Sequence, residues 1–422
     1  MLQRSSNWIL IPVCIPLLTC CSDQISHKSQ VFVETFRSEG LNDDQVIQKA
    51  IDEAGEGGSV IFQASREYQL KNGLNVKKFQ TLIGNNATLK RADQTYSHLR
   101  LPAKAADSFL LVDSLPPGWK PGDLLQVFTD EKSIHSTSFA DDHILPNIIT
   151  RMDSTGISLS TPVGTSNDGS ISTWPKGAVV RKVFTLLRGD SINFKSCPFT
   201  VSNINFDGNK VGNNLNYYWN VNSTIFTRGL GARVENCRFY EIPNENIVGQ
   251  GIYVENCQAA NLNGSFVHLS GVDTIRYFQQ KSSIITGNTV NGVCLMNTAI
   301  TGHSEGAITS SYNGGFATIV NNRIYDCREA AFGVIDSPVD TADGGKSELV
   351  ISNNIFRNCK TIIHRVSYIA DSTKLSRDIF LNGNIFSNCG YNDWRPFAKD
   401  PKHYPQIRIG VNDVTNNTVW LY

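Results

Sequence analysis

Asparagines recur through the second half of the chain, each between two short runs rich in β-branched and aromatic residues. Successive positions are 20 to 34 residues apart, at Asn203, Asn236, Asn256, Asn288, Asn322, Asn354, Asn384 and Asn417. A repeat of this length with strands and turns, but no helical periodicity, is typical of a β-solenoid. The spacing predicts an all-β chain folded as a right-handed parallel β-helix.

The physical chemistry of asparagine fits such a stack. A coil must bend sharply between two strands, and asparagine tolerates the left-handed backbone region that the bend needs. Coils lie about 4.8 Å apart, so equivalent amides can hydrogen-bond along the axis. We therefore expect each asparagine to be both the bend residue and a member of an amide ladder. An antiparallel sandwich needs no equal spacing, and a leucine-rich solenoid needs leucines that this repeat lacks.

Three cysteines share one place in the repeat, each at the end of a segment such as Asn-Ile-Phe-Arg-Asn-Cys: Cys327, Cys359 and Cys389. Equivalent cysteines in successive coils predict a stack of buried small apolar groups. Metal ligation is disfavoured because no close cysteine pair or Cys-His cluster occurs. Three of the ten cysteines belong to the N-terminal signal, and the odd number that remains argues against a full set of disulfides.

The N-terminus has the pattern of an export signal. Arg4 precedes the apolar run Trp8 to Leu18, and Leu18-Thr19-Cys20-Cys21 is followed by polar residues. This resembles the lipobox of bacterial lipoproteins, which implies a signal peptide at 1–21 and lipid attachment at Cys21, with Cys20 as the alternative. An ordinary secretory signal is the other interpretation. The resemblance implies a lipid-anchored protein of the bacterial cell envelope, at the outer membrane, cell surface or periplasmic face.

The mature chain divides into three parts. Residues 22–100 hold an N-terminal cap helix, with an apolar stripe from Val46 to Ala54 between Asp43-Asp44 and Gly57-Gly58, and the first coils. Residues 101–187 break the repeat and predict a small β insertion, and 188–422 form the main β-helix. The segment from Asn42 and the later Leu82-Ile-Gly-Asn-Asn-Ala-Thr-Leu resemble the opening of pectate-lyase-like β-helix proteins. That superfamily includes polysaccharide lyases, glycoside hydrolases, uronan epimerases and phage tailspikes.

Charge and hydropathy argue against a nucleic-acid partner and against a membrane-spanning helix. Lys and Arg total 38, as do Asp and Glu, so nothing indicates a nucleic-acid partner. The mature region has no apolar run near 20 residues, which argues against a membrane-spanning helix. A polysaccharide is the expected partner, because outward residues of successive coils lie side by side and suit an extended polymer.

Long turns at 271–283, 309–317, 337–347 and 368–377 follow equivalent strands and predict a groove along one flank. The strands before them carry three histidines in roughly equivalent places, His268, His303 and His364. The same group of strands also carries the polar residues Glu305, Asp336, Arg365 and Tyr368.

These groups fit β-elimination on a uronic-acid polymer. Arg365 or Arg276 could neutralise the uronate carboxylate, and His303 or His268 could remove the C5 proton. Tyr368 could protonate the leaving oxygen, and Glu305 could orient a histidine or hold Ca²⁺. The groove could also bind through Lys281, Arg328, Asp336, His364 and Trp394.

Two other functions compete with a lyase. A hydrolase needs two carboxyls, which Glu305 and Asp336 could supply, with Asp273 or Glu329 as substitutes. Gly302-His303-Ser304-Glu305-Gly306 loosely resembles the Gly-His-Gly segment of polygalacturonase-type hydrolases, but the other motifs of that family are missing. Aromatic clusters at Trp219 and Trp394 would suit a non-catalytic glycan-binding solenoid. The sequence favours a lipid-anchored lyase acting on a glycosaminoglycan such as chondroitin or hyaluronan, or on pectin.

Overall fold

The computed structural model describes residues 29–129, 147–164, 171–189, 197–213, 223–227, 231–270, 282–295, 306–311, 316–336, 347–367, 377–389, 393–395 and 407–409. Residues 1–28, which include Cys21, lie outside this part of the chain. No helix of the described part is long and apolar enough to cross a membrane.

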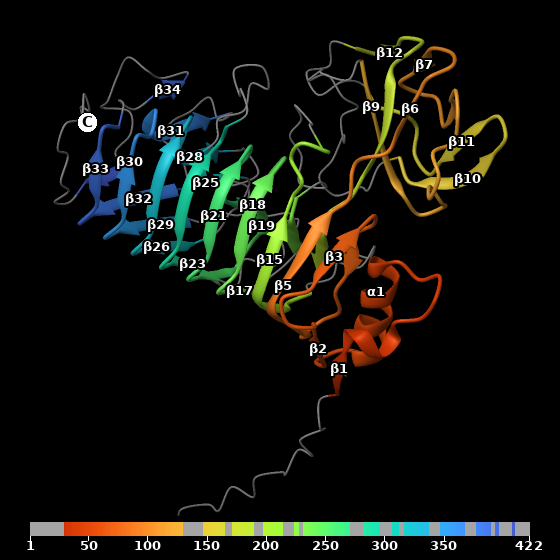
Figure 1. Cartoon of the computed structure of the whole chain (residues 1–422). Coiled ribbons are helices and arrows are strands. Elements are labelled where there is room, and N and C mark those ends of the chain that lie inside the picture. The colour runs from red at the N-terminus through yellow and green to blue at the C-terminus, as the bar shows by residue number, and fades with distance from the viewer. Residues whose placement is uncertain are drawn as a thin grey trace, which may run out of the picture.

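The described strands stack as the right-handed parallel β-helix that the asparagine spacing predicts (Figure 1). Each full coil contributes two strands to a large parallel sheet and a third to a nine-stranded parallel sheet, here called sheet B. The first limb contains β1 (Gln30–Phe32), β2 (Ser59–Ile61), β17 (Arg233–Glu235), β20 (Tyr253–Glu255), β23 (Ser283–Thr286), β26 (Ala317–Val320), β29 (Ser347–Ser352), β32 (Arg377–Asn382) and β35 (Ile407–Ile409).

The second limb continues each coil after a bend. It contains β3 (Glu67–Leu70), β18 (Arg238–Ile242), β21 (Gln258–Leu262), β24 (Thr289–Val293), β27 (Arg323–Cys327), β30 (Ile355–Arg357) and β33 (Ile385–Ser387), while β5 (Thr81–Arg91) and β15 (Thr200–Asp207) run through both limbs. Sheet B contains β4 (Leu74–Asn75), β14 (Leu187–Gly189), β16 (Ile225–Thr227), β19 (Ile247–Gly249), β22 (Val267–Ser270), β25 (Gly306–Ser311), β28 (Ala330–Asp336), β31 (Thr361–Ser367) and β34 (Asp393–Arg395).

An amide ladder runs up the bend between the first and second limbs. The backbone nitrogen and Nδ2 of Asn322 both donate to Oδ1 of Asn354, each at 2.9 Å. The same pair of bonds joins Asn288 to Asn322 at 3.1 and 2.9 Å, and Asn354 to Asn384 at 3.0 and 3.0 Å. All four side chains are buried. The predicted ladder is confirmed for these four residues, and Asn417 lies outside the described part.

The expectation that one asparagine serves as both bend and ladder was wrong. The left-handed bend residue is the one before the ladder position, and it is Asn236, Asn256, Gly287, Asn321, Asn353 or Gly383 in successive coils. Asn203 also has a positive φ. Asn203, Asn236 and Asn256 therefore belong to the bend, and Ile204, Cys237 and Cys257 fill the ladder position after them. The two tasks need different residues, because only the residue after the bend is buried in the core.

Apolar side chains from all three limbs fill the interior, as alternation along each strand requires. The predicted cysteine stack is confirmed, since Cys327, Cys359 and Cys389 lie one coil apart beside the bend that leads into sheet B. All seven cysteines of the described part are buried and free, and the other four are Cys197, Cys237, Cys257 and Cys294. Burial raises the pKa of the Cys294 thiol well above its ordinary value.

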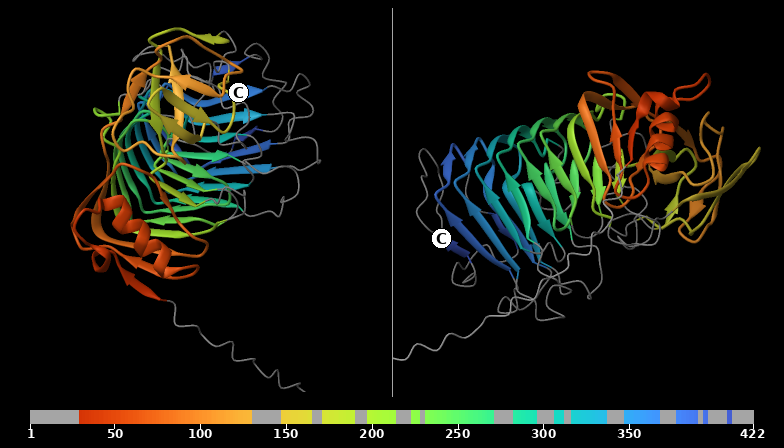
Figure 2. Two further views of the ribbon diagram at one scale, coloured as in Figure 1. Left: turned by 90° about the vertical axis from the view of Figure 1, so that its right-hand side faces the viewer. Right: turned by 90° about the horizontal axis from the view of Figure 1, so that it is seen from below.

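A helix covers the N-terminal end of the stack, as predicted (Figure 2). Helix α1 (Asp43–Ala54) follows the short 3-10 helix η1 (Val33–Phe36) and buries Val46, Ile47, Ala50, Ile51 and Ala54 against the first coil. Its N-cap is Asn42 rather than the expected Asp43-Asp44 pair, because Asn42 and Gln45 form a reciprocal capping box. The helix ends at Gly55, which has a φ of 64°, rather than at Gly57-Gly58.

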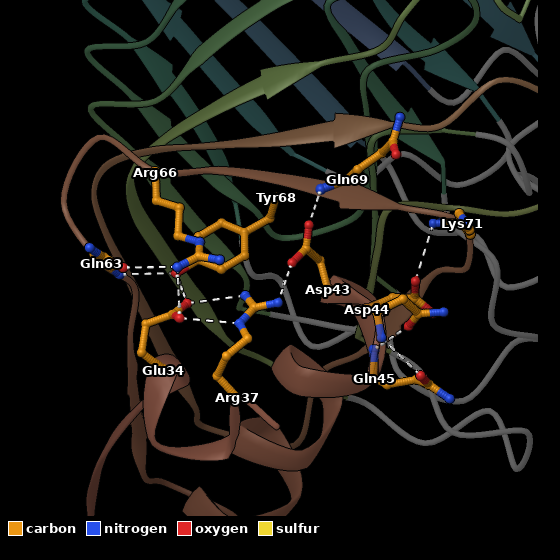
Figure 3. A network of polar contacts seen from close by, with 11 residues as sticks. Glu34, Arg37, Asp43, Asp44, Gln45, Gln63, Arg66, Tyr68, Gln69 and Lys71 are labelled. Carbon is orange, nitrogen blue, oxygen red and sulfur yellow. Dashed lines mark hydrogen bonds and ion pairs between the residues drawn. The ribbon is translucent and has the colours of Figure 1, made fainter. Parts of the chain in front are cut away.

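A polar network ties this cap to the first coil (Figure 3). The Glu34 carboxylate accepts hydrogen bonds from Arg37, from Arg66 at 2.8 Å and from the Tyr68 hydroxyl at 2.8 Å. Arg37 also bonds to Asp43 at 2.6 Å. Partial burial raises the pKa of Tyr68 to about 12. The network fixes η1 and the start of α1 over the first solenoid edge, where unpaired strand groups would otherwise invite association.

Eight strands between β5 and β14 pair only with one another and form the insertion, which lies at the N-terminal end of the stack (Figures 1 and 2). They are antiparallel and enclose a separate core that includes Leu125, Trp174 and Val180. The strands are β6 (Tyr96–His98), β7 (Ala103–Lys104), β8 (Phe109–Leu111), β9 (Leu124–Phe128), β10 (Ile149–Asp153), β11 (Gly156–Leu159), β12 (Thr173–Trp174) and β13 (Val179–Val183).

Candidate functional site

The outer face of sheet B carries a column of residues in exact strand register. Val267 and Leu269 face the core, so His268 between them lies on the opposite face. Register pairs then extend this outer column along the solenoid through Phe226, Val248, His268, Thr309, Gly333, His364 and Asp393. Phe226 and Val248 form a small apolar cluster. The column therefore changes from apolar to polar at His268.

His268 is held by a carboxylate from the preceding coil. Its Nδ1 contacts Oε1 of Glu245, which precedes β19. The Glu245 side chain is fully buried, and that of His268 is 8% exposed. An imidazole bonded to a carboxylate through Nδ1 has a fixed ring orientation and presents Nε2 for a second task. This is the arrangement that general-base histidines use.

Further buried polar groups surround the pair. The main-chain oxygens of Glu245 and Asn246 accept bonds from the amide of Thr224 in the previous coil, at 3.2 and 3.0 Å. Ser265 and Thr309 join their hydroxyls at 2.9 Å, and Thr309 also accepts from the amide of Gly306 at 3.0 Å. These bonds link four consecutive coils, because Ser265 precedes β22 in the coil of His268 and Thr309 lies on β25 in the coil after it.

His364 shares the outer column with His268 but is not next to it. Thr309 and Gly333 stand between them, so three strand spacings, about 14 Å, separate the two histidines. That distance is too large for both to act on one sugar ring, and it suits two positions along an extended polymer. His364 is half-buried.

The structure corrects the proposed equivalence of the three histidines. Strand β25 begins at Gly306, so it starts after His303, and the residue in register with His268 is Thr309. His303, Glu305, Tyr368, Arg276 and Lys281 lie outside the described residues and stay predictions.

The backbones of three further candidates are described. Arg365 is in register with Val334 and Trp394. These three residues form the column next to that of His364. Val334 of this column is buried in the core, and the role of Arg365 stays a prediction. Asp336, the last residue of β28, pairs with Ser367.

Arg328 lies away from the outer column, at the bend that leads from the second limb into sheet B. It lines an open hollow of about 460 Å³ together with Lys360, Asp326, Asn358 and Asn388. Arg328 donates to the main-chain oxygen of Leu295 at 3.0 Å, and Lys360 approaches Glu329 at 3.4 Å. The amides of Asn358 and Asn388 continue an exposed ladder from Asp326, with bonds of 2.7 Å. The hollow offers two cations beside a row of amides.

Glu245 was missed by the sequence analysis, which looked for acids only near the three histidines. One signal was available, since the polar run Asn244-Glu245-Asn246 interrupts two buried segments immediately before a sheet B strand. Among the described residues, no group of three or more His, Cys, Asp or Glu side chains could hold a metal ion. The suggested Ca²⁺ ligand Glu305 is outside them.

No protein-family model matches the sequence, and no curated protein is significantly similar to it. Among solved structures, the chain is similar to XylC in complex with xylose, with 10% identity, a TM-score of 0.45, and coverage of 87% of this chain and 68% of that one.

Two further similar structures have comparable scores. They are the surface adhesin PfbA of Streptococcus pneumoniae (14% identity, TM-score 0.41, 93% and 78% covered) and a polygalacturonase of Erwinia carotovora (11% identity, TM-score 0.42, 95% and 98% covered). At these values the fold rests on the strand pairing of this chain, and no activity is carried over.

Proposed function

We propose that the protein is a polysaccharide lyase that cleaves a uronic-acid-containing polymer on the outer face of sheet B, with His268 as the base. The observation that carries the proposal is the contact between His268 Nδ1 and the buried carboxylate of Glu245. A fully buried acid at one ring nitrogen fixes the direction of the other nitrogen, as a base requires.

The reaction is a β-elimination. Nε2 of His268 takes the C5 proton, the electrons of that C–H bond form the C4–C5 double bond, and the C4–O4 bond breaks. The departing oxygen takes a proton from an acid, for which Tyr368 is the candidate. Because the C5 proton is weakly acidic, the uronate carboxylate must be neutralised, and Arg276 or Arg365 is proposed for this role. Arg276 is favoured, since it follows β22 in the same coil as His268.

Two features support an extended acidic substrate. His268 and His364 occupy one outer column about 14 Å apart, which fits contacts to different sugars of one chain. At the bend into this sheet, Arg328 lines the open hollow and donates to the Leu295 main-chain oxygen, which leaves further guanidinium donors for an acidic group. We further propose that lipid at Cys21 holds the enzyme at the bacterial cell envelope, where a polymer from outside the cell is accessible.

The test uses protein that starts after Cys21, incubated with pectin, alginate, chondroitin and hyaluronan. Formation of unsaturated uronate is followed by its ultraviolet absorbance, and total cleavage by new reducing ends. A lyase gives both signals in equal amounts. New reducing ends without ultraviolet absorbance would favour a hydrolase that uses Glu305 and Asp336 as its two carboxyl groups. Binding of a polymer without cleavage would favour a glycan-binding solenoid.

Variants then test the site itself. We expect Arg276→Lys and His268→Gln to abolish most activity, while Arg100→Lys, on the surface of the insertion, keeps it. Full activity in His268→Gln would exclude His268 as the base and return the choice to His303.

A further inference from the structure

A cavity of about 290 Å³ lies where the N-terminal cap meets the insertion. Three parts of the chain line it: the start of α1 with β3, the link from β5 into the insertion, and the turn before β9 with the end of β13. Its volume is at the lower end of the range for small-molecule sites, which suits one sugar ring.

The floor of the cavity is fixed by a buried ion pair. Lys182 Nζ approaches Asp123 Oδ2 at 2.9 Å, and both side chains are 7% exposed. The same ammonium donates to Asn72 Oδ1 at 2.5 Å, while Asn72 Nδ2 donates to Asp44 at 2.6 Å. An ammonium has three donors, so the two bonds found among the described residues leave one for an occupant.

One wall is apolar and held in place. Trp119, 5% exposed, donates from Nε1 to the Thr95 hydroxyl at 2.7 Å, and Phe184 also lines the cavity. Because Thr95 accepts this bond through its oxygen, its hydroxyl proton can be donated to an occupant. An apolar wall beside hydroxyl and amide groups matches a pyranose ring, which has apolar faces and a polar rim.

The rim carries one cation and one acid. Lys71 is exposed, and its ammonium makes no ion pair within the described residues. Asp93 accepts from Asn209 Nδ2 at 2.8 Å through Oδ1, which leaves Oδ2 to accept from a hydroxyl. A ligand with both a carboxylate and hydroxyl groups would use both side chains.

We propose that this cavity binds a single uronic acid unit, with Lys71 and Lys182 directed to its carboxylate, Asp93 and Thr95 to its hydroxyls, and Trp119 and Phe184 to its ring. The assignment rests on the proposed function for the source of the sugar, an acidic polysaccharide or its fragments. It does not rest on the elimination reaction, because none of these residues belongs to sheet B. The site would hold polymer at a distance from the reacting bond.

The experiment measures binding of D-galacturonate and D-glucuronate by saturation-transfer NMR and calorimetry, with D-galactose and D-glucose as neutral probes. The full mature chain is used. We expect a uronate to bind and its neutral counterpart to bind about tenfold more weakly, since the neutral sugar lacks the carboxylate to which the two lysines are directed. Lys71→Met should remove the preference for the uronate. Asp93→Ala should lower the affinity for both the uronate and the neutral sugar. Lys104→Met, an exposed lysine of the insertion, is the matched control.

Cleavage assays keep the two proposals apart. Loss of the uronate preference in Lys71→Met, with cleavage of short oligosaccharides retained, supports the cavity. A uronate preference that persists in Lys71→Met and unchanged affinity in Asp93→Ala, with binding lost in His268→Gln, would place the sugar on sheet B and overturn this inference, as would the absence of any uronate binding. If the cavity binds uronate but the protein cleaves no polymer, this inference holds and the proposed lyase activity is excluded.

Discussion

Glu245 and His268 come from consecutive coils, and their side chains meet beneath the outer face of sheet B. If the carboxylate orients the base, Glu245→Gln keeps the shape but loses the charge that stabilises the protonated ring. We expect kcat to fall about 100-fold in His268→Gln and by a smaller factor in Glu245→Gln, with KM little changed. Steady-state kinetics on the polymer that gives unsaturated product measures both.

A structural pair would behave differently. Replacement of either Glu245 or His268 would then lower the midpoint of thermal unfolding in proportion to the lost activity. Replacement of both residues together would restore stability and activity. His98→Gln, on β6 of the insertion, is the control for a generic histidine replacement.

The amide ladder predicts a large stability effect at one residue. Asn354→Ala removes the acceptor of two bonds from Asn322 and the donor to the Ile319 oxygen at 2.9 Å. Because the orphaned groups are buried, we expect a loss of about 3 kcal/mol in the free energy of unfolding, measured by urea denaturation. Asn358→Gly, in the exposed ladder at the other bend, should lose less than about 1 kcal/mol. Equal losses at the two positions would contradict the central role of the buried ladder.

The buried cysteines predict a specific thiol count. A chain that begins after Cys21 holds seven cysteines, and all seven are buried and free. Burial also raises the pKa of the Cys237 and Cys294 thiols, so little thiolate forms at these two positions. We expect an aromatic disulfide reagent to titrate almost no thiols in the native protein and seven in denaturant. Five or fewer thiols in the denatured sample would reveal a disulfide.

The cap network predicts loss of stability in acid. Burial acts to raise the pKa of Glu34, but the bonds from Arg37 and Tyr68 and the charges of Arg37 and Arg66 outweigh it and lower the pKa. The stabilisation is thus present above the ordinary value of 4.5 and is lost as the pH falls through the lowered value. Glu34→Gln should be less stable than the parent at pH 7 and equal to it at the acid end of a melting series. Glu39 lies outside the network, so the stability of Glu39→Gln serves as the control.

The proposed lipid anchor predicts a biochemical phenotype. Expressed with its signal, the chain should partition into detergent and incorporate labelled fatty acid, whereas Cys21→Ser should do neither. Cys20→Ser should still be lipidated. Label that persists in Cys21→Ser and disappears in Cys20→Ser would move the attachment site by one residue.

The sequence predicted the architecture better than the site. Asparagines and cysteines recur at equivalent places because equivalent positions of successive coils stack, so the coil period can be read without coordinates. We expected one asparagine to form both the bend and the ladder because asparagine occupies both positions in two coils, at Asn321-Asn322 and Asn353-Asn354. Only the strand register separates a residue that turns the backbone from the buried residue after it.

The site depends on contacts that spacing does not encode. His268 was a correct candidate for the outer face, but its partner Glu245 lies 23 residues earlier, in a turn with no histidine. His303 looked equivalent to His268 because both precede long turns, yet β25 starts three residues after it and the register selects Thr309. An error of a few residues moves a side chain to another face, because strand faces alternate at every residue.

The amide ladder has a polarity. Asn288, Asn322 and Asn354 each donate from Nδ2 to Oδ1 of the asparagine in the following coil. The same nitrogens also donate to a main-chain oxygen of the preceding coil, at Val254, Ile285 and Ile319. One side chain therefore joins three coils, and damage at a single asparagine would loosen the solenoid in both directions along its axis.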